Sequence, residues 1–124
     1  MPGIVPETLW LSTFAGTNKD AKTHLKALQI YNESIFETPK PEQLIARILE
    51  IATNENEIVM DSFLGSGTTV STAHKMGRNY IGIECEPQTC EYVIKRMDQV
   101  VAGERGGISK KVNWTGGGDY QFVY

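Results

Sequence analysis

The sequence lacks the features that mark several large classes of protein. It has only two cysteines, Cys85 and Cys90, in 124 residues. Two are too few for a disulfide framework or a zinc site, and they fit a reducing cytoplasm. No apolar run approaches the roughly 20 residues that a membrane span needs, and the first residues lack the basic and apolar regions of a secretory signal. We therefore expect a cytoplasmic protein without a membrane segment or a metal site.

Positive charge is also scarce. The 12 lysines and arginines are outnumbered by 15 aspartates and glutamates, which gives a formal net charge of −3. The chain as a whole is thus not a basic clamp for nucleic acid, and any contact with DNA would be local or would need a further segment. Its length suffices for one compact domain with a hydrophobic core.

Helices and strands alternate in the pattern from residue 38 onward. Thr38-Pro39-Lys40-Pro41 opens a helix, and its apolar stripe follows as Leu44, Ile45, Ile48, Leu49 and Ala52. The apolar run 58–60 predicts a buried strand ending at Asp61, and 79–83 predicts a second strand ending at Glu84. Helices are predicted over 68–76 and from Pro87 to about residue 101, and a last strand over 120–124. This order implies a parallel sheet with helices on both faces.

The remaining segments show weaker patterns. Residues 1–37 are predicted to be irregular apart from a short helix over 20–28, and residues 103–118 to form a glycine-rich loop.

Two acids and a glycine turn gather at the edge of this sheet where ligands bind, beyond the carboxyl ends of the strands. Asp61 follows the first strand, Glu84 follows the second, and Gly65-Ser66-Gly67 leads into the helix between them. Glycines let a ligand approach the backbone, and the free N–H groups of Thr68 and Thr69 attract an anion. Glu84 lies 19 residues after Gly65, a spacing that suits an acid accepting hydrogen bonds from ribose hydroxyls. The pattern predicts a site for a nucleoside with an anionic tail.

Two common nucleotides fit this turn poorly. A Walker A loop for ATP needs a lysine after the glycine, and Thr68 follows Gly67. The NAD fingerprint needs glycine or alanine at position 70, where Val70 stands.

The same residues resemble a known family. The segment Asp-Ser-Phe-Leu-Gly-Ser-Gly-Thr-Thr at 61–69 resembles motif I of the amino-methyltransferases that act on DNA, and residues 38–45 resemble their motif X. Motif X upstream of motif I is the order of the β class. Residues 78–84 resemble the motif II strand. The flanks, 5–17 and 107–118, are similar to the modification subunits of Type III restriction-modification systems.

The resemblance implies a Rossmann-like α/β fold of S-adenosylmethionine-dependent methyltransferases, with a partial parallel sheet and flanking helices. Residues 38–124 would form the cofactor-binding subdomain, and residues 1–37 would lead in from an upstream target-recognition region. The parent protein would transfer a methyl group to adenine N6 in double-stranded DNA and would work with a restriction subunit.

The resemblance also assigns the cofactor-binding residues. The loop after the first strand would line S-adenosylmethionine, the start of the next helix would bind its methionine carboxylate, Asp61 its amino group and Glu84 its ribose hydroxyls. Cys85 would flank the adenine ring, and the motif X segment would close the pocket. The full set is Thr38, Lys40, Asp61, Phe63, Gly65, Ser66, Gly67, Thr68, Thr69, Glu84 and Cys85.

The base-holding motif of the family, Asp-Pro-Pro-Tyr or a close variant, is missing, because the sequence has no Pro-Pro pair. We therefore expect a C-terminal fragment that has no catalytic residue of its own, binds cofactor weakly, does not methylate DNA alone and self-associates through unpaired sheet edges. Cytosine N4 stays open as the methylated group, and a non-catalytic scaffold stays open as the function. An NAD-binding domain is disfavoured by Val70 and by motif X.

Overall fold

A computed structural model describes residues 5–31 and 36–124 of the chain. Two short helices come first, α1 (Ser12–Ala15) and α2 (Asn18–Ala27), followed by α3 (Glu42–Ala52). A β-α-β unit comes next, made of β1 (Ile58–Asp61), α4 (Thr68–Lys75) and β2 (Asn79–Gly82), and α5 (Pro87–Val101) completes the order. Within the described residues, the last regular element is therefore α5.

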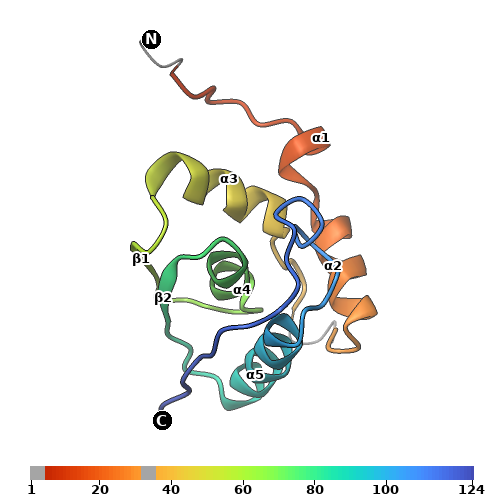
Figure 1. Cartoon of the computed structure of the whole chain (residues 1–124). Coiled ribbons are helices and arrows are strands. Elements are labelled where there is room, and N and C mark those ends of the chain that lie inside the picture. The colour runs from red at the N-terminus through yellow and green to blue at the C-terminus, as the bar shows by residue number, and fades with distance from the viewer. Residues whose placement is uncertain (1–4, 32–35) are drawn as a thin grey trace.

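The sheet is parallel, as the sequence predicted. Its two strands pair from Ile58 opposite Asn79 to Asp61 opposite Gly82, and α4 connects them. Figure 1 shows α4 at the centre of the molecule, between α3 and α5, with the strands along one side. The predicted β-α-β arrangement is confirmed, and it places the ends of both strands beside the start of α4.

One face of this sheet is not covered within the described residues, although the sequence predicted buried strands with helices on both faces. Ile58 is 67% exposed and Met60 is 62% exposed. Ile81 pairs with Met60 in register, so both point to the same face, and Ile81 is exposed as well. A helix packs on the other face, where the Val70 side chain of α4 approaches Gly82.

The predicted strand over 120–124 is wrong. These residues have no regular structure, and Tyr120 turns toward α5, where its hydroxyl lies 2.7 Å from Asp98 Oδ1 and 3.2 Å from the Ile94 carbonyl. A strand forms only where a segment lies beside the backbone of another strand. This segment packs against α5 instead, so it does not pair with either strand.

The N-terminal segment has more structure than the sequence predicted. The helix expected over 20–28 is confirmed as α2, which a capping box between Thr17 and Asp20 begins. The short helix α1 was not predicted. Leu25 and Leu28 of the α2 region are buried with Ile30 and Phe36 in a small core cluster. Much of this segment is therefore packed rather than irregular.

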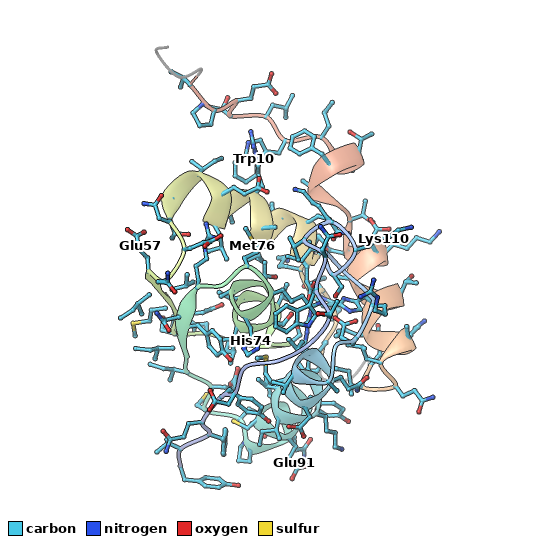
Figure 2. The ribbon with its side chains drawn as sticks, in the orientation of Figure 1. Trp10, Glu57, His74, Met76, Glu91 and Lys110 are labelled. Atoms are coloured by element: carbon cyan, nitrogen blue, oxygen red, sulfur yellow. The ribbon has the colours of Figure 1, made fainter. Side chains whose placement is uncertain are left out.

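The main core lies between α4 and α5 and is closed by the C-terminal segment. It contains Val70, Val93, Met97 and Val100. Trp114 packs on this cluster and donates from Nε1 to the Val100 carbonyl at 2.7 Å. His74, labelled in Figure 2, lies between Tyr80 and the C-terminal segment, with Nδ1 2.8 Å from the Tyr80 hydroxyl and Nε2 2.9 Å from the Gly117 carbonyl. His74 and Trp114 therefore fix the packing of the C-terminal segment.

No helix among residues 5–31 and 36–124 has both the length and the apolar character required to cross a membrane.

The core assignment predicts the effect of truncating a buried methionine. Met97 is 1% exposed and Met60 is 62% exposed. Met97→Ala should lower the free energy of unfolding by roughly 2 to 5 kcal/mol, because it leaves a cavity in a packed core. Met60→Ala is the matched control and should change it by no more than about 0.5 kcal/mol in dilute solution, where association between chains does not contribute. Urea denaturation of both variants measures the difference, and equal losses would contradict this description of the core.

Candidate functional site

The loop between β1 and α4 begins at Asp61, whose carboxylate bridges the two elements. Asp61 Oδ1 accepts a hydrogen bond from the Phe63 N–H at 3.0 Å, and Oδ2 accepts one from the Thr69 hydroxyl at 2.6 Å. The two bonds tie the start of the loop to the first turn of α4. They also show that two of the hydrogen bonds that this carboxylate can accept come from within the protein.

The glycine turn needs glycine for two reasons. Gly67 precedes α4 with φ 74°, in the left-handed region that side chains other than glycine rarely adopt. A Cβ on Gly67 would also lie 3.2 Å from Val93 Cγ1, so α5 presses closely against the turn. Gly65 likewise has a positive φ of 54°. The two glycines thus allow the turn to adopt positive φ angles and to pack closely on α5.

Glu84 holds the same loop from the end of β2. Its Oε2 accepts from the Gly65 N–H at 2.9 Å, while Oε1 accepts from the N–H groups of Cys85 at 2.8 Å and Glu86 at 3.1 Å. Desolvation opposes the charge, but these backbone hydrogen bonds outweigh it and keep the pKa of Glu84 below its ordinary value. The predicted meeting of Glu84 with the glycine turn is therefore confirmed, and Glu84 is a carboxylate at neutral pH.

A cavity of about 460 Å³ opens between this loop and the segment before α3, a volume within the range of small-molecule sites. Eight of the eleven residues that the sequence assigned to the cofactor line it, while Gly67 lies at the N-cap of α4, and Glu84 and Cys85 lie outside the lining. The eight are Thr38, Lys40, Asp61, Phe63, Gly65, Ser66, Thr68 and Thr69.

The sequence missed five other residues of the lining: Phe36, Glu37, Pro39, Ile45 and Leu64. All five flank or interrupt the two motifs that identify the site. Their position within the two motifs or just before motif X was the signal that could have found them.

Thr68 and Thr69 in the first turn of α4 line the cavity, and their hydroxyls are bonded inside the protein. The Thr68 hydroxyl donates to the Lys40 carbonyl at 3.0 Å, and the Thr69 hydroxyl donates to Asp61. The N–H groups at the start of a helix have no helical carbonyl to bind, and the helix dipole makes this end favourable for negative charge. The turn is therefore suited to an anion.

A buried carboxylate, which the sequence did not identify, joins the helices around the site. Glu42 in the first turn of α3 is 1% exposed. It accepts hydrogen bonds from Ser71, from Lys75 Nζ at 2.9 Å, from Arg96 Nη2 at 3.1 Å and from the Ile108 N–H at 3.0 Å. The sequence analysis placed Ile48 in the apolar stripe of this helix, but Ile48 is 41% exposed, whereas Glu42 faces inward.

A second acid, Glu104, extends this network toward α2. Both of its carboxylate oxygens lie 3.2 Å from His24 Nε2, and Lys75 donates to it as well. Burial opposes its charge, but the hydrogen bonds from His24 and Lys75 prevail and lower the pKa of Glu104 to about 2. His24, Glu42 and Glu104 lie close enough together to hold a metal ion. The Lys75 ammonium already binds both carboxylates, so the cation of this cluster is Lys75.

The lowered pKa of Glu104 predicts acid sensitivity with a definite sign. Because the folded-state pKa lies below the ordinary 4.5, the stabilisation is present above pH 4.5 and is lost as the pH falls toward 2. Glu104→Gln should remove a contribution on the order of 2 to 3 kcal/mol at neutral pH and flatten the loss between pH 4.5 and 2. Some loss should remain, since the pKa of Glu42 is also lowered.

Urea denaturation at several pH values measures this effect. Glu91→Gln is the control, because Glu91 is exposed and projects from α5 at the lower edge of the molecule in Figure 2. Glu91→Gln should keep the wild-type dependence on pH. The same steep acid loss in Glu104→Gln would show that Glu104 does not carry it.

Known proteins match much of this chain. The family model described as DNA methylase matches residues 3–95. A protein of Haemophilus influenzae, named a probable type III restriction-modification enzyme HindVI Mod subunit, is 53% identical over 85 residues, which are 68% of this chain and 11% of that protein. The type II methyltransferase M1.MboII of Moraxella bovis is 50% identical over 56 residues, 45% of this chain and 20% of that protein. The chain thus spans a fifth or less of these relatives.

A solved structure supports the predicted methyltransferase fold. It is that of a Thermus thermophilus protein, described as a putative DNA modification methylase complexed with S-adenosyl-L-methionine. The similarity covers 82% of this chain and 41% of that chain, with 23% sequence identity and a TM-score of 0.50. At this level of identity the likeness bears on the fold alone.

Proposed function

This chain belongs to the DNA methylase family, and we propose that the cavity between the motif I loop and the segment before α3 binds S-adenosylmethionine. The observation that carries the proposal is the convergence of Glu84, the Gly65 turn and the first turn of α4 at one edge of the sheet. An acid and a helix start in this arrangement suit a ligand that has a ribose at one end and a carboxylate at the other.

Three parts of the cofactor have a matching group in the chain. The N–H groups of Thr68 and Thr69 would bind the methionine carboxylate. The acidic side chain of Asp61 would attract the amino group. Glu84 accepts three backbone hydrogen bonds, and a carboxylate has about four acceptor sites. Capacity therefore remains for ribose hydroxyls.

The proposed reaction of the whole protein is methylation of adenine N6 in double-stranded DNA, in the cytoplasm and as part of a restriction-modification system with a restriction subunit. The relative named as a type III Mod subunit supports this assignment. S-Adenosylmethionine supplies the electrophilic methyl group, and the residues of this chain hold and orient it. The target base would be held by residues outside this chain, so we propose that the chain alone does not methylate DNA.

Isothermal titration with S-adenosylmethionine tests the proposed site. The wild-type chain should bind saturably, and Glu84→Gln should bind roughly 10- to 100-fold more weakly, because it loses charged hydrogen bonds worth about 1.5 to 3 kcal/mol. Glu86→Gln is the control, since Glu86 is a neighbouring exposed acid, and it should bind like the wild type. A folded wild-type chain that does not bind, or equal affinities for wild type and Glu84→Gln, would contradict the proposal.

We also propose that the chain self-associates through the uncovered face of its sheet. The exposed apolar side chains there are Ile58, Met60, Ile81 and Ile83. Exposed apolar patches of this kind mark interaction surfaces, and a two-stranded sheet also leaves unpaired edges.

Light scattering at increasing concentration tests this second proposal. The wild type should form dimers or larger species, and Met60→Lys combined with Ile81→Lys should shift it toward monomer, because both changes lie on one cross-strand pair. Ile51→Lys on α3, where Ile51 is 42% exposed, is the control and should leave the association unchanged. A monodisperse wild-type monomer at high concentration would refute the proposal.

A further inference from the structure

The turn that leads into α4 is held by a side chain that does not line the cavity. Arg96 on α5 is 2% exposed. Its Nη1 donates to the Ser66 carbonyl at 2.9 Å and to the Thr68 hydroxyl at 3.1 Å, while Nη2 donates to Glu42 at 3.1 Å. One guanidinium therefore joins the motif I turn to the buried carboxylate of α3.

These contacts restrain the backbone N–H groups at the start of α4, where Thr68 and Thr69 line the cavity. The Ser66 carbonyl and the Gly67 N–H belong to one rigid peptide plane, and the Gly67 N–H donates to the Leu64 carbonyl at 3.1 Å. With the Ser66 carbonyl bound to Arg96, this plane is held at both ends. The Thr68 hydroxyl fixes the next residue, so little freedom remains for the N–H groups of Thr68 and Thr69.

Arginine suits this position better than lysine would. Its planar guanidinium presents several N–H donors in a fixed geometry, whereas a lysine ammonium is a point charge on a flexible stem. The negative charge of Glu42 balances the buried cation. The pairing holds the guanidinium against the turn, and Arg96 is not among the residues that line the cavity.

We propose that Arg96 is a positioning residue that orients the first turn of α4 for the amino-acid half of the cofactor. The inference rests on the proposed function, because it assumes that the methionine carboxylate binds at this turn. Its specific consequence is that replacing Arg96 weakens binding of the amino-acid half and leaves binding of the nucleoside half unchanged. A purely structural role would weaken both halves together.

Two ligands separate these outcomes. S-Adenosylhomocysteine and 5′-methylthioadenosine are both thioethers of adenosine, and only the first carries the amino-acid group. The affinity of the 124-residue chain for S-adenosylhomocysteine divided by its affinity for 5′-methylthioadenosine reports the contribution of that group. Titration or competition measures this ratio. Arg96→Lys should lower this ratio at least about tenfold, with the affinity for 5′-methylthioadenosine within about twofold of the wild type.

Arg78→Lys is the matched control. Arg78 donates to the carbonyls of Thr53 and Met76 and to the Thr53 hydroxyl, so like Arg96 it binds backbone carbonyl and threonine hydroxyl groups, but without a carboxylate partner. It lies beyond the opposite end of α4, so Arg78→Lys should leave the ratio unchanged even if it lowers stability. An unchanged ratio in Arg96→Lys, or an equal fall in both variants, would overturn the inference.

Thr68→Val provides a second test that does not depend on folding of an Arg96 variant. It removes the hydroxyl that Arg96 binds, together with the bond from that hydroxyl to the Lys40 carbonyl, and it keeps the backbone N–H and the side-chain shape. The ratio should fall, by less than in Arg96→Lys, because the Ser66 contact remains, and an unchanged ratio would count against the inference. If the wild type binds neither ligand, the proposed function fails first, and that result is distinct from failure of the role of Arg96.

Discussion

The buried carboxylate of Glu42 is the interaction on which the rest of the structure depends. It lies at the start of α3 and binds Ser71 and Lys75 of α4, Arg96 of α5 and the Ile108 N–H. Removing a carboxylate from water costs several kcal/mol unless cations and hydrogen bonds compensate it. Here two cations and two neutral donors do so. The mutual position of the three helices is therefore specified by charge as well as by apolar packing.

This arrangement determines the shape of the cavity. Because α3 is fixed against α4 at Glu42, the residues just before α3 lie beside the first turn of α4, and the Lys40 carbonyl accepts the Thr68 hydroxyl. One wall of the cavity comes from the segment before α3, and the floor comes from the motif I loop. A change at Glu42 would thus move a wall that Glu42 itself does not form.

The motif I loop is held at three points by groups from different elements. Asp61 binds its start, Glu84 binds Gly65, and Arg96 binds Ser66. A loop restrained in this way loses little further conformational freedom when a ligand binds, and that is the physical basis of preorganisation. The restraints hold Gly65 and Gly67 at positive φ angles, a backbone conformation that residues other than glycine rarely adopt.

The local features of this architecture could be predicted from the sequence, and the nonlocal ones could not. The β-α-β unit and the convergence of Glu84 with Gly65 follow from hydrophobic periodicity and from the rule that parallel strands end at one edge. The partners of Glu42 are 29 to 66 residues away, and no pattern in the chain indicates them. The failed strand at 120–124 has the same cause, because β-propensity describes a segment and not where the rest of the fold places it, which here is against α5. The exposed side chains of Ile58 and Met60 likewise reflect which elements cover the sheet, and their apolar character carries no information about that.

The two acids that the family resemblance assigns to ligand binding also hold the protein together. Asp61 binds Thr69 and Glu84 binds Gly65, so removing either acid would disturb the turn as well as any direct contact. A loss of affinity in such a variant has two components, direct and positional. Arg96 contributes only the positional component, because it binds the turn without lining the cavity. Comparing the loss of affinity in an Arg96 variant with the loss in a Glu84 variant therefore separates the two components.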